Sequence, residues 1–173
     1  MPAYSSLLEE ALEAWSYTRD GVLAELRGIP EESYDWQPTA PSRTVAELAR
    51  HILESGLLMA GELTRDDGDF TRQSYTDHIA EHAPDSDAVQ GKDALLEALV
   101  ATHAEADARF RELGELRMLQ YIRRFDGQRG TRLAWLYHGV EHESYHRGQL
   151  AVYARMLGIV PALTRQIYGG DGG

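Results

Sequence analysis

Hydrophobic residues recur every third or fourth position along four stretches of the chain, the spacing that places them on one face of an α-helix. Gly28 and Pro30 end the first stretch, because both residues interrupt helices. Thr44 and Glu47 open the second stretch with the spacing of a capping box. The pattern therefore predicts helices over residues 5–27, 44–64, 92–113 and 131–157.

Three connections join these helices. Residues 29–43 ("IPEESYDWQPTAPSR") hold three prolines and are typical of a turn-rich connector. Residues 66–91 predict a long polar loop, within which "DHIAEH" is compatible with a short helix. Residues 117–130 ("RMLQYIRRFDGQRG") fit either a turn of helix followed by a loop or a small hairpin. Gly158 predicts a cap at the end of the last helix, and we expect the final "YGGDGG" to fray.

Four amphipathic helices without a clear strand pattern indicate an all-α four-helix bundle. The long connection at residues 66–91 permits an overhand crossover, so the helices need not alternate simply up and down. A chain of 173 residues can bury one sizeable core. We therefore expect a single domain over residues 1–168 and a flexible tail over residues 169–173.

Composition narrows the class of function. The net charge of −11 disfavours nucleic acids and anionic membranes as partners, because both bind basic surfaces. No apolar run reaches the ~18 residues of a membrane span, and the N-terminal residues do not resemble a secretion signal, so we expect a cytoplasmic protein. The chain has no cysteine. Any thiol chemistry would therefore use a thiol that binds from outside.

Candidate chemistry centres on "HGVEHESYHRGQL", which places His138, His142 and His146 at four-residue intervals in the last predicted helix. Residues four apart drift by only ~40° around a helix, so the three imidazoles share one face. An adjacent pair can reach one metal ion, since their β-carbons lie ~6 Å apart. The outer two are ~12 Å apart. One ion would thus use one adjacent pair and a ligand from another helix.

His51 is the best candidate for that additional ligand. It lies in the second helix, next to Ile52 and close to the apolar face, where its polar nitrogens need a partner. We expect His78 and His82, in the loop-like region, and His103, in a polar patch of the third helix, to be ordinary polar residues.

Other polar residues near the stripe carry weaker signals. Gln149 could bridge helices or orient a ligand, and Glu143 is expected to be a surface charge without a chemical role. Gly148 in mid-helix indicates that another helix approaches closely at this level. A dinuclear ferritin-like centre would need two ExxH motifs, and only one, from Glu143 to His146, is present. A mononuclear centre is favoured.

Two segments resemble the DinB/YfiT-like family of bacterial proteins: "VEHESYHRGQLAVYARMLGIVP" and "YDWQPTAPSRTVAELARHILE". The resemblance implies a four-helix bundle with crossover connectivity, often dimeric, that holds a divalent metal, commonly zinc or nickel, through three histidines. Carried over residue by residue, these ligands fall on His51, His142 and His146. We expect His138 and Tyr153 to contact either the metal-ligating side chains or the substrate.

The resemblance also implies an activity, because some members of the wider family are enzymes that use mycothiol or bacillithiol in S-transfer or isomerisation. We therefore expect a metal-dependent thiol S-transferase in detoxification or stress response, acting on a small molecule with a low-molecular-weight thiol as co-substrate, and a homodimer. Three neutral imidazoles leave a divalent ion its charge and open positions. The alternatives are a hydrolase that uses a metal-bound hydroxide, and a non-catalytic bundle that binds metal or small ligands.

Overall fold

The computed structural model describes residues 5–169. The four long helices are α1 (Leu7–Gly28), α2 (Val45–Thr64), α4 (Lys92–Leu113) and α6 (Arg132–Met156). The shorter elements are helices α3 (Tyr75–His82), α5 (Glu115–Met118) and α7 (Ala162–Tyr168), strands β1 (Tyr121–Arg123) and β2 (Arg129–Thr131), and the 3₁₀ turns Glu31–Ser33, Phe70–Arg72 and Ser86–Ala88. None of the described helices is long and apolar enough to cross a membrane.

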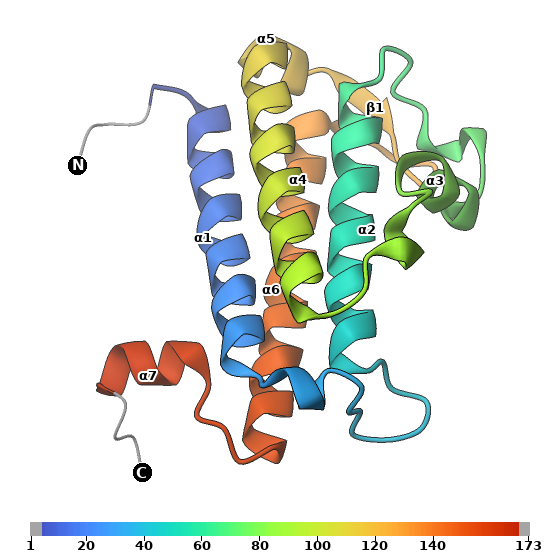
Figure 1. Cartoon of the computed structure of the whole chain (residues 1–173). Coiled ribbons are helices and arrows are strands. Elements are labelled where there is room, and N and C mark those ends of the chain that lie inside the picture. Colours follow the sequence, from blue (N-terminus) through green and yellow to red (C-terminus); the bar gives the residue numbers. More distant parts are fainter. Residues whose placement is uncertain (1–4, 170–173) are drawn as a thin grey trace.

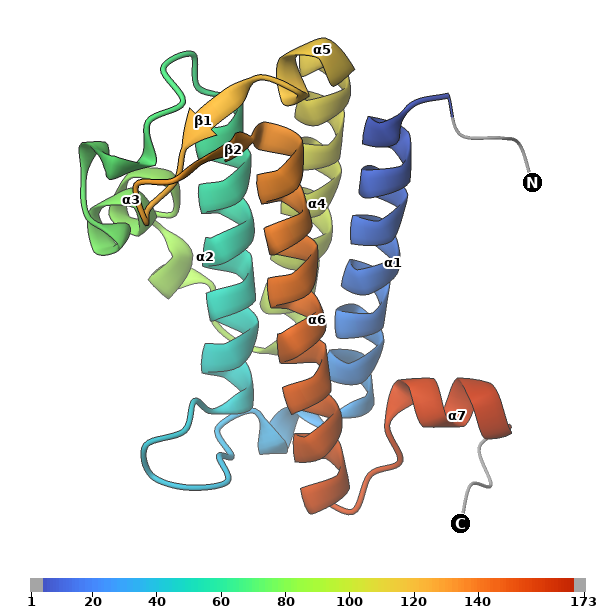
Figure 2. The same ribbon diagram turned by 180° about the vertical axis from the view of Figure 1, so that it is seen from behind.

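The long helices form the predicted bundle, with an overhand crossover. α1 packs against α6 and α4, and α2 packs against α4 and α6, so consecutive helices α1 and α2 face each other across a diagonal (Figures 1 and 2). Following the chain colours, α2 and α4 run in one direction and α1 and α6 in the other (Figure 1). Residues 65–91 make this possible, because they return along the bundle from the end of α2 to the start of α4.

Local sequence signals set several helix ends. The predicted capping box is present: the Thr44 hydroxyl accepts from the Glu47 backbone N–H, and the Glu47 carboxylate accepts from the Thr44 N–H at 2.7 Å. Gly158 has φ +76°, a left-handed conformation that glycine adopts without steric cost and that follows the end of α6.

The core has two halves, one at each end of the bundle. One half surrounds Leu26 and Leu48, and the other surrounds Trp15 and Phe110. Buried polar residues lie at the level between them, notably Arg19 of α1 and Glu143 and His146 of α6. Most of the apolar burial that stabilises the fold therefore lies above and below a polar layer, and the candidate metal ligands belong to that layer.

Two elements differ from the sequence prediction. Residues 117–130 combine the two alternatives, because the helical turn α5 is followed by an antiparallel hairpin in which Tyr121 pairs with Thr131. α7 was not expected. Its first N–H groups have no local cap, and the Glu25 carboxylate of α1 accepts a hydrogen bond from Ala162 N–H at 2.9 Å. Of the predicted tail, Gly169 caps α7, and residues 170–173 lie outside the described part of the chain.

The outer face of α6 contradicts the prediction of a close helix approach at Gly148. Apart from the neighbouring residues and backbone of α6 itself, no described atom lies within 4 Å of the place where a β-carbon would stand at this position. The same face carries Tyr145, Val152 and Met156, which are 64%, 51% and 57% exposed. This apolar stripe is therefore uncovered in the single chain.

Candidate metal centre

The structure brings His51 of α2 together with His142 and His146 of α6. Nε2 of His142 lies 3.1 Å from Nε2 of His51 and 3.0 Å from Nε2 of His146. The three ligand atoms lie within 4.8 Å of one another. Zn–N bonds of ~2.0–2.1 Å separate the nitrogens of a tetrahedral ion by ~3.3 Å. The spacing is therefore close to what one shared ion requires.

Hydrogen bonding also fits a metal ion. Nδ1 of His146 lies 2.7 Å from the Gln149 side-chain oxygen, which can only accept, so Nδ1 carries the proton and Nε2 offers its lone pair to the centre. Ligating histidines commonly donate their second ring N–H in this way. Gln149 thus accepts from a candidate ligand of its own helix and does not bridge helices. His142 and His51 lie with their Nε2 atoms toward the same point, where one cation can satisfy all three lone pairs.

The surroundings keep these imidazoles neutral. Burial lowers the pKa of His51 to about 3, and the nearby Arg43 guanidinium acts in the same direction. Burial also lowers the pKa of His142 to about 4, with a further contribution from His146. The pKa of His146 is likewise lowered, mainly by burial. Neutral imidazole is the form that binds metal, so the donors are ready to bind at neutral pH.

Glu143 contradicts the expectation of a surface charge. It is 2% exposed and accepts hydrogen bonds from Arg19 Nε at 2.8 Å, from the second Arg19 nitrogen at 2.6 Å, and from Trp15 Nε1 at 2.7 Å. Arg19 also donates to the Leu99 carbonyl at 2.8 Å. This ion pair joins α1 to α6 directly behind His142. Because all its partners are protein groups, Glu143 holds the ligand-bearing helix in place.

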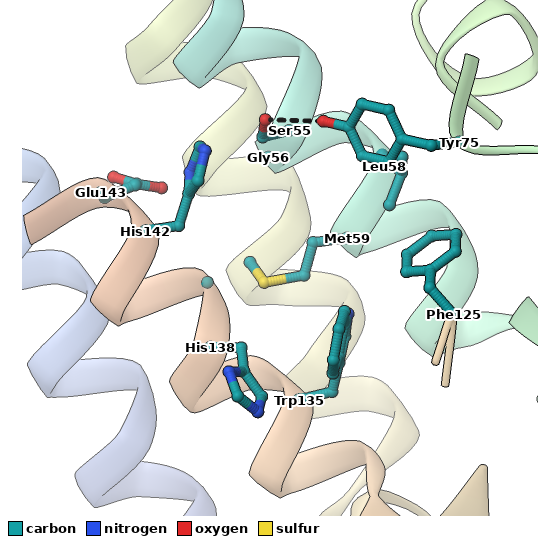
Figure 3. A pocket seen from close by; sticks show the side chains of 11 residues that line it. Ser55, Gly56, Leu58, Met59, Tyr75, Phe125, Trp135, His138, His142 and Glu143 are labelled. Atoms are coloured by element: carbon teal, nitrogen blue, oxygen red, sulfur yellow. Dashed lines mark hydrogen bonds between the residues drawn. The ribbon is translucent and has the colours of Figure 1, made fainter. Parts of the chain in front are cut away.

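An apolar cavity of about 320 Å³ opens on the His142 side of the centre. Met59 of α2 and Trp135 and His138 of α6 line it, while Tyr75 of α3 and Phe125 of the hairpin turn form its outer wall (Figure 3). The Tyr75 hydroxyl lies 3.5 Å from Ser55 Oγ, and both residues line the cavity (Figure 3). The crossover segment and the hairpin, both poorly defined in the sequence, thus build the wall of this cavity.

A second cavity, of about 460 Å³, opens on the His51 side. Its lining is polar and includes Arg43, Arg50, Glu47 and Glu54. The two cavities therefore meet the three-histidine group from different sides and differ in chemistry.

The remaining sequence candidates lie as follows. His138 is half exposed, lines the apolar cavity and lies 4.8 Å from the Trp135 ring centroid. The Tyr153 hydroxyl donates to the Arg43 carbonyl at 3.1 Å, so Tyr153 supports the wall of the polar cavity. His103 lies 3.1 Å from Ser16 Oγ, away from the centre.

A four-helix bundle with overhand connectivity and three converging imidazoles between α2 and α6 defines a class of helical proteins with a candidate mononuclear metal centre. The DinB family profile matches residues 3–168. The chain belongs to the DinB family.

Solved structures share this fold. YfiT from Bacillus subtilis, described as a probable metal-dependent hydrolase with an unusual four-helix bundle topology, is similar with a TM-score of 0.70 and 14% identity, over 92% of this chain and 94% of that chain. The DinB-like protein YjoA from Bacillus subtilis has a TM-score of 0.64 and 23% identity, over 86% and 92%. A DinB family member from Exiguobacterium sibiricum has a TM-score of 0.60 and 21% identity, over 90% and 95%. A search of curated proteins finds no match.

Proposed function

We propose that this DinB family protein is a metal-dependent thiol S-transferase that joins a polar low-molecular-weight thiol to an apolar electrophile. The observation that carries the proposal is the position of the three imidazoles between two cavities of opposite character. A transfer between two organic substrates needs two binding sites, whereas hydrolysis needs one organic substrate and water.

His51, His142 and His146 would hold the divalent ion. When bound, the ion lowers the pKa of a ligand thiol and so supplies the nucleophile that this cysteine-free chain lacks. The charges of Arg43 and Arg50, interspersed with Glu47 and Glu54, suit the carboxylates, amines and hydroxyls of a polar thiol. The Trp135 ring and Met59 thioether suit an apolar electrophile.

His138 is the candidate substrate contact on the apolar side. It lines the apolar cavity, where its half-exposed ring could orient the electrophile, and the Glu141 carboxylate lies 3.7 Å from Nδ1. The sulfur forms a bond to the electrophilic carbon, the leaving group departs with the bonding electrons, and the thiol proton passes to solvent. Glu143 is unavailable as a base because Arg19 and Trp15 occupy both its oxygens.

The test uses zinc- or nickel-loaded protein with bacillithiol, mycothiol or glutathione and a chlorodinitrobenzene electrophile. We expect metal-dependent thioether formation that is lost in His142→Ala and kept in the matched variant His103→Ala. Lack of thioether formation, with hydrolysis of ester or amide substrates that no thiol perturbs, would favour a hydrolase instead. That second candidate function is supported by the similarity to YfiT, which is described as a probable metal-dependent hydrolase.

A further inference from the structure

A second group of potential metal ligands lies at the junction of α2 and α3. It contains Glu62 of α2 with His78, Glu81 and His82 of α3, and one ligand atom from each lies within 4.8 Å of the others. Glu62 is about three helical turns (~16 Å) beyond His51 along α2, so this group is separate from the three-histidine centre. His78 and His82 were expected to be ordinary polar residues because they lie in a region predicted to be loop-like, and their partner Glu62 belongs to a distant segment.

Glu62 is the anchor of the group. It is fully buried, and its Oε1 lies 3.0 Å from Nδ1 of His78 and 2.6 Å from Nε2 of His82. Arg72 contacts the same oxygen. The other oxygen, Oε2, is also buried and finds no hydrogen-bond partner within the described residues. A buried carboxylate oxygen normally has a partner, so Glu62 has unused capacity to bind a cation.

His78 is oriented as a ligand would be. It is fully buried, and its Nε2 lies 3.0 Å from the Phe70 carbonyl oxygen, which can only accept, so Nε2 carries a proton. In the neutral ring, Nδ1 then presents a lone pair toward the Glu62 carboxylate. Two acceptors 3.0 Å apart repel each other unless a positive charge lies beside them; the Arg72 guanidinium, 3.3 Å from Nδ1, is the charge that a metal ion would replace. An imidazole whose far N–H is held by a backbone carbonyl is the usual arrangement around bound metals.

His82 completes a pair with His78 at i and i+4, the same spacing as His142 and His146. Its ring lies against Gly61, where an added β-carbon would stand 2.2 Å from Nδ1. The glycine therefore makes room for the imidazole beside Glu62. The His82 side chain is 15% exposed, which gives an ion a path from solvent.

Arg72 supplies positive charge at this point. Its terminal nitrogen contacts Glu62, lies 2.7 Å from Glu81, and lies 3.3 Å from Nδ1 of His78. Its side chain is 21% exposed and Glu81 is more exposed still, so the guanidinium can leave Glu62 and stay paired with Glu81. A metal ion and Arg72 would thus compete for one oxygen.

We propose that Glu62, His78 and His82 form a second divalent-metal site, for which zinc best matches two imidazoles and one carboxylate, and that Arg72 competes with the ion for Glu62. The site would tie α3 to α2. Because α3 begins at Tyr75, the bound ion would also hold the wall of the apolar cavity in place.

The experiment measures zinc binding by isothermal titration calorimetry in the variant His142→Ala/His146→Ala, which lacks the first centre. We expect one remaining equivalent of zinc. Adding His82→Ala should lower the affinity for this zinc by more than the ~10- to 100-fold that is typical when a residue hydrogen-bonded to a metal ligand is lost. Adding Arg72→Met should tighten it by ~10- to 100-fold, the factor for one hydrogen bond to a charged group.

A gain of affinity in Arg72→Met separates ligand competition from a merely structural role, which could only weaken binding. The matched control is His103→Ala in the same background, which should leave the titration unchanged. If circular dichroism shows that His142→Ala/His146→Ala does not fold, the bound zinc is counted in the protein with its native histidines. Two equivalents are then expected for the native protein and one for His82→Ala. Failure to bind a second equivalent, retention of it in His82→Ala, or no tightening in Arg72→Met would overturn the proposal, whatever the fate of the first centre.

Discussion

Replacing Arg19 with methionine should destabilise the protein severely. The substitution preserves most of the apolar volume but removes the two hydrogen bonds at 2.8 and 2.6 Å that neutralise Glu143, whose side chain is 3% exposed. Stranding one partner of a buried ion pair costs ~3–5 kcal/mol. A domain is typically stable by only ~5–15 kcal/mol, so this loss would take a large share of the total.

The assays are urea unfolding and thermal unfolding, both followed by circular dichroism, in chelator so that metal binding does not contribute. At ~2–4 °C per kcal/mol for a chain of this size, the expected loss corresponds to a fall of ~6–20 °C in Tm. The double variant Arg19→Met/Glu143→Leu removes both charges and should recover much of the loss, because hydrophobic replacements of buried pairs are often tolerated. A cost below ~1 kcal/mol for Arg19→Met, or a double variant as unstable as the summed single variants, would refute the reasoning.

Three further outcomes are expected. His142→Ala should release metal from the three-histidine centre, as measured by plasma emission spectrometry of protein purified without a tag, whereas full retention would reject the centre. In chelator, the free energy of unfolding should fall as pH drops from ~6.5 toward 4. In that range His51 becomes protonated in the unfolded chain but not in the folded chain, where its pKa is about 3. His51→Ala should therefore make the free energy of unfolding depend less on pH, and an unchanged dependence would contradict this expectation. The protein should sediment as a homodimer through the uncovered stripe of α6, and Val152→Glu should give a monomer; a native monomer at micromolar concentration would count against this.

The sequence allowed the bundle to be predicted because its helices carry local signals. Apolar periodicity, the Thr44 capping box and Gly158 all act within a few residues of the helix they define. Two of the candidate ligands could also be predicted from the sequence, since the spacing of His142 and His146 alone places them on one helix face. His51 required a judgement that a histidine beside Ile52 lies close to the apolar face, and the family resemblance supported it.

The parts that could not be predicted depend on partners far away in the chain. Glu143 is buried only because Arg19, 124 residues earlier, neutralises it. α7 begins where it does because Glu25, 137 residues before Ala162, accepts its first N–H. His78 faces a buried carboxylate of another helix. No local pattern reports such contacts, because each side chain alone resembles an ordinary surface residue.

α6 is the element in which structural and functional demands conflict. Leu136 and Leu150 face the two halves of the core, yet Glu143 and His146 between them occupy buried positions that a purely structural bundle would fill with apolar side chains. Burying these groups costs free energy that only a complete set of partners offsets. Glu143 finds its partners in Arg19 and Trp15. Within residues 5–169, the hydrogen-bond contacts of the three imidazoles are to one another and to Gln149. Three imidazoles that can each turn a nitrogen lone pair toward the same point are satisfied together by one shared cation, which is the physical reason to look for an ion there.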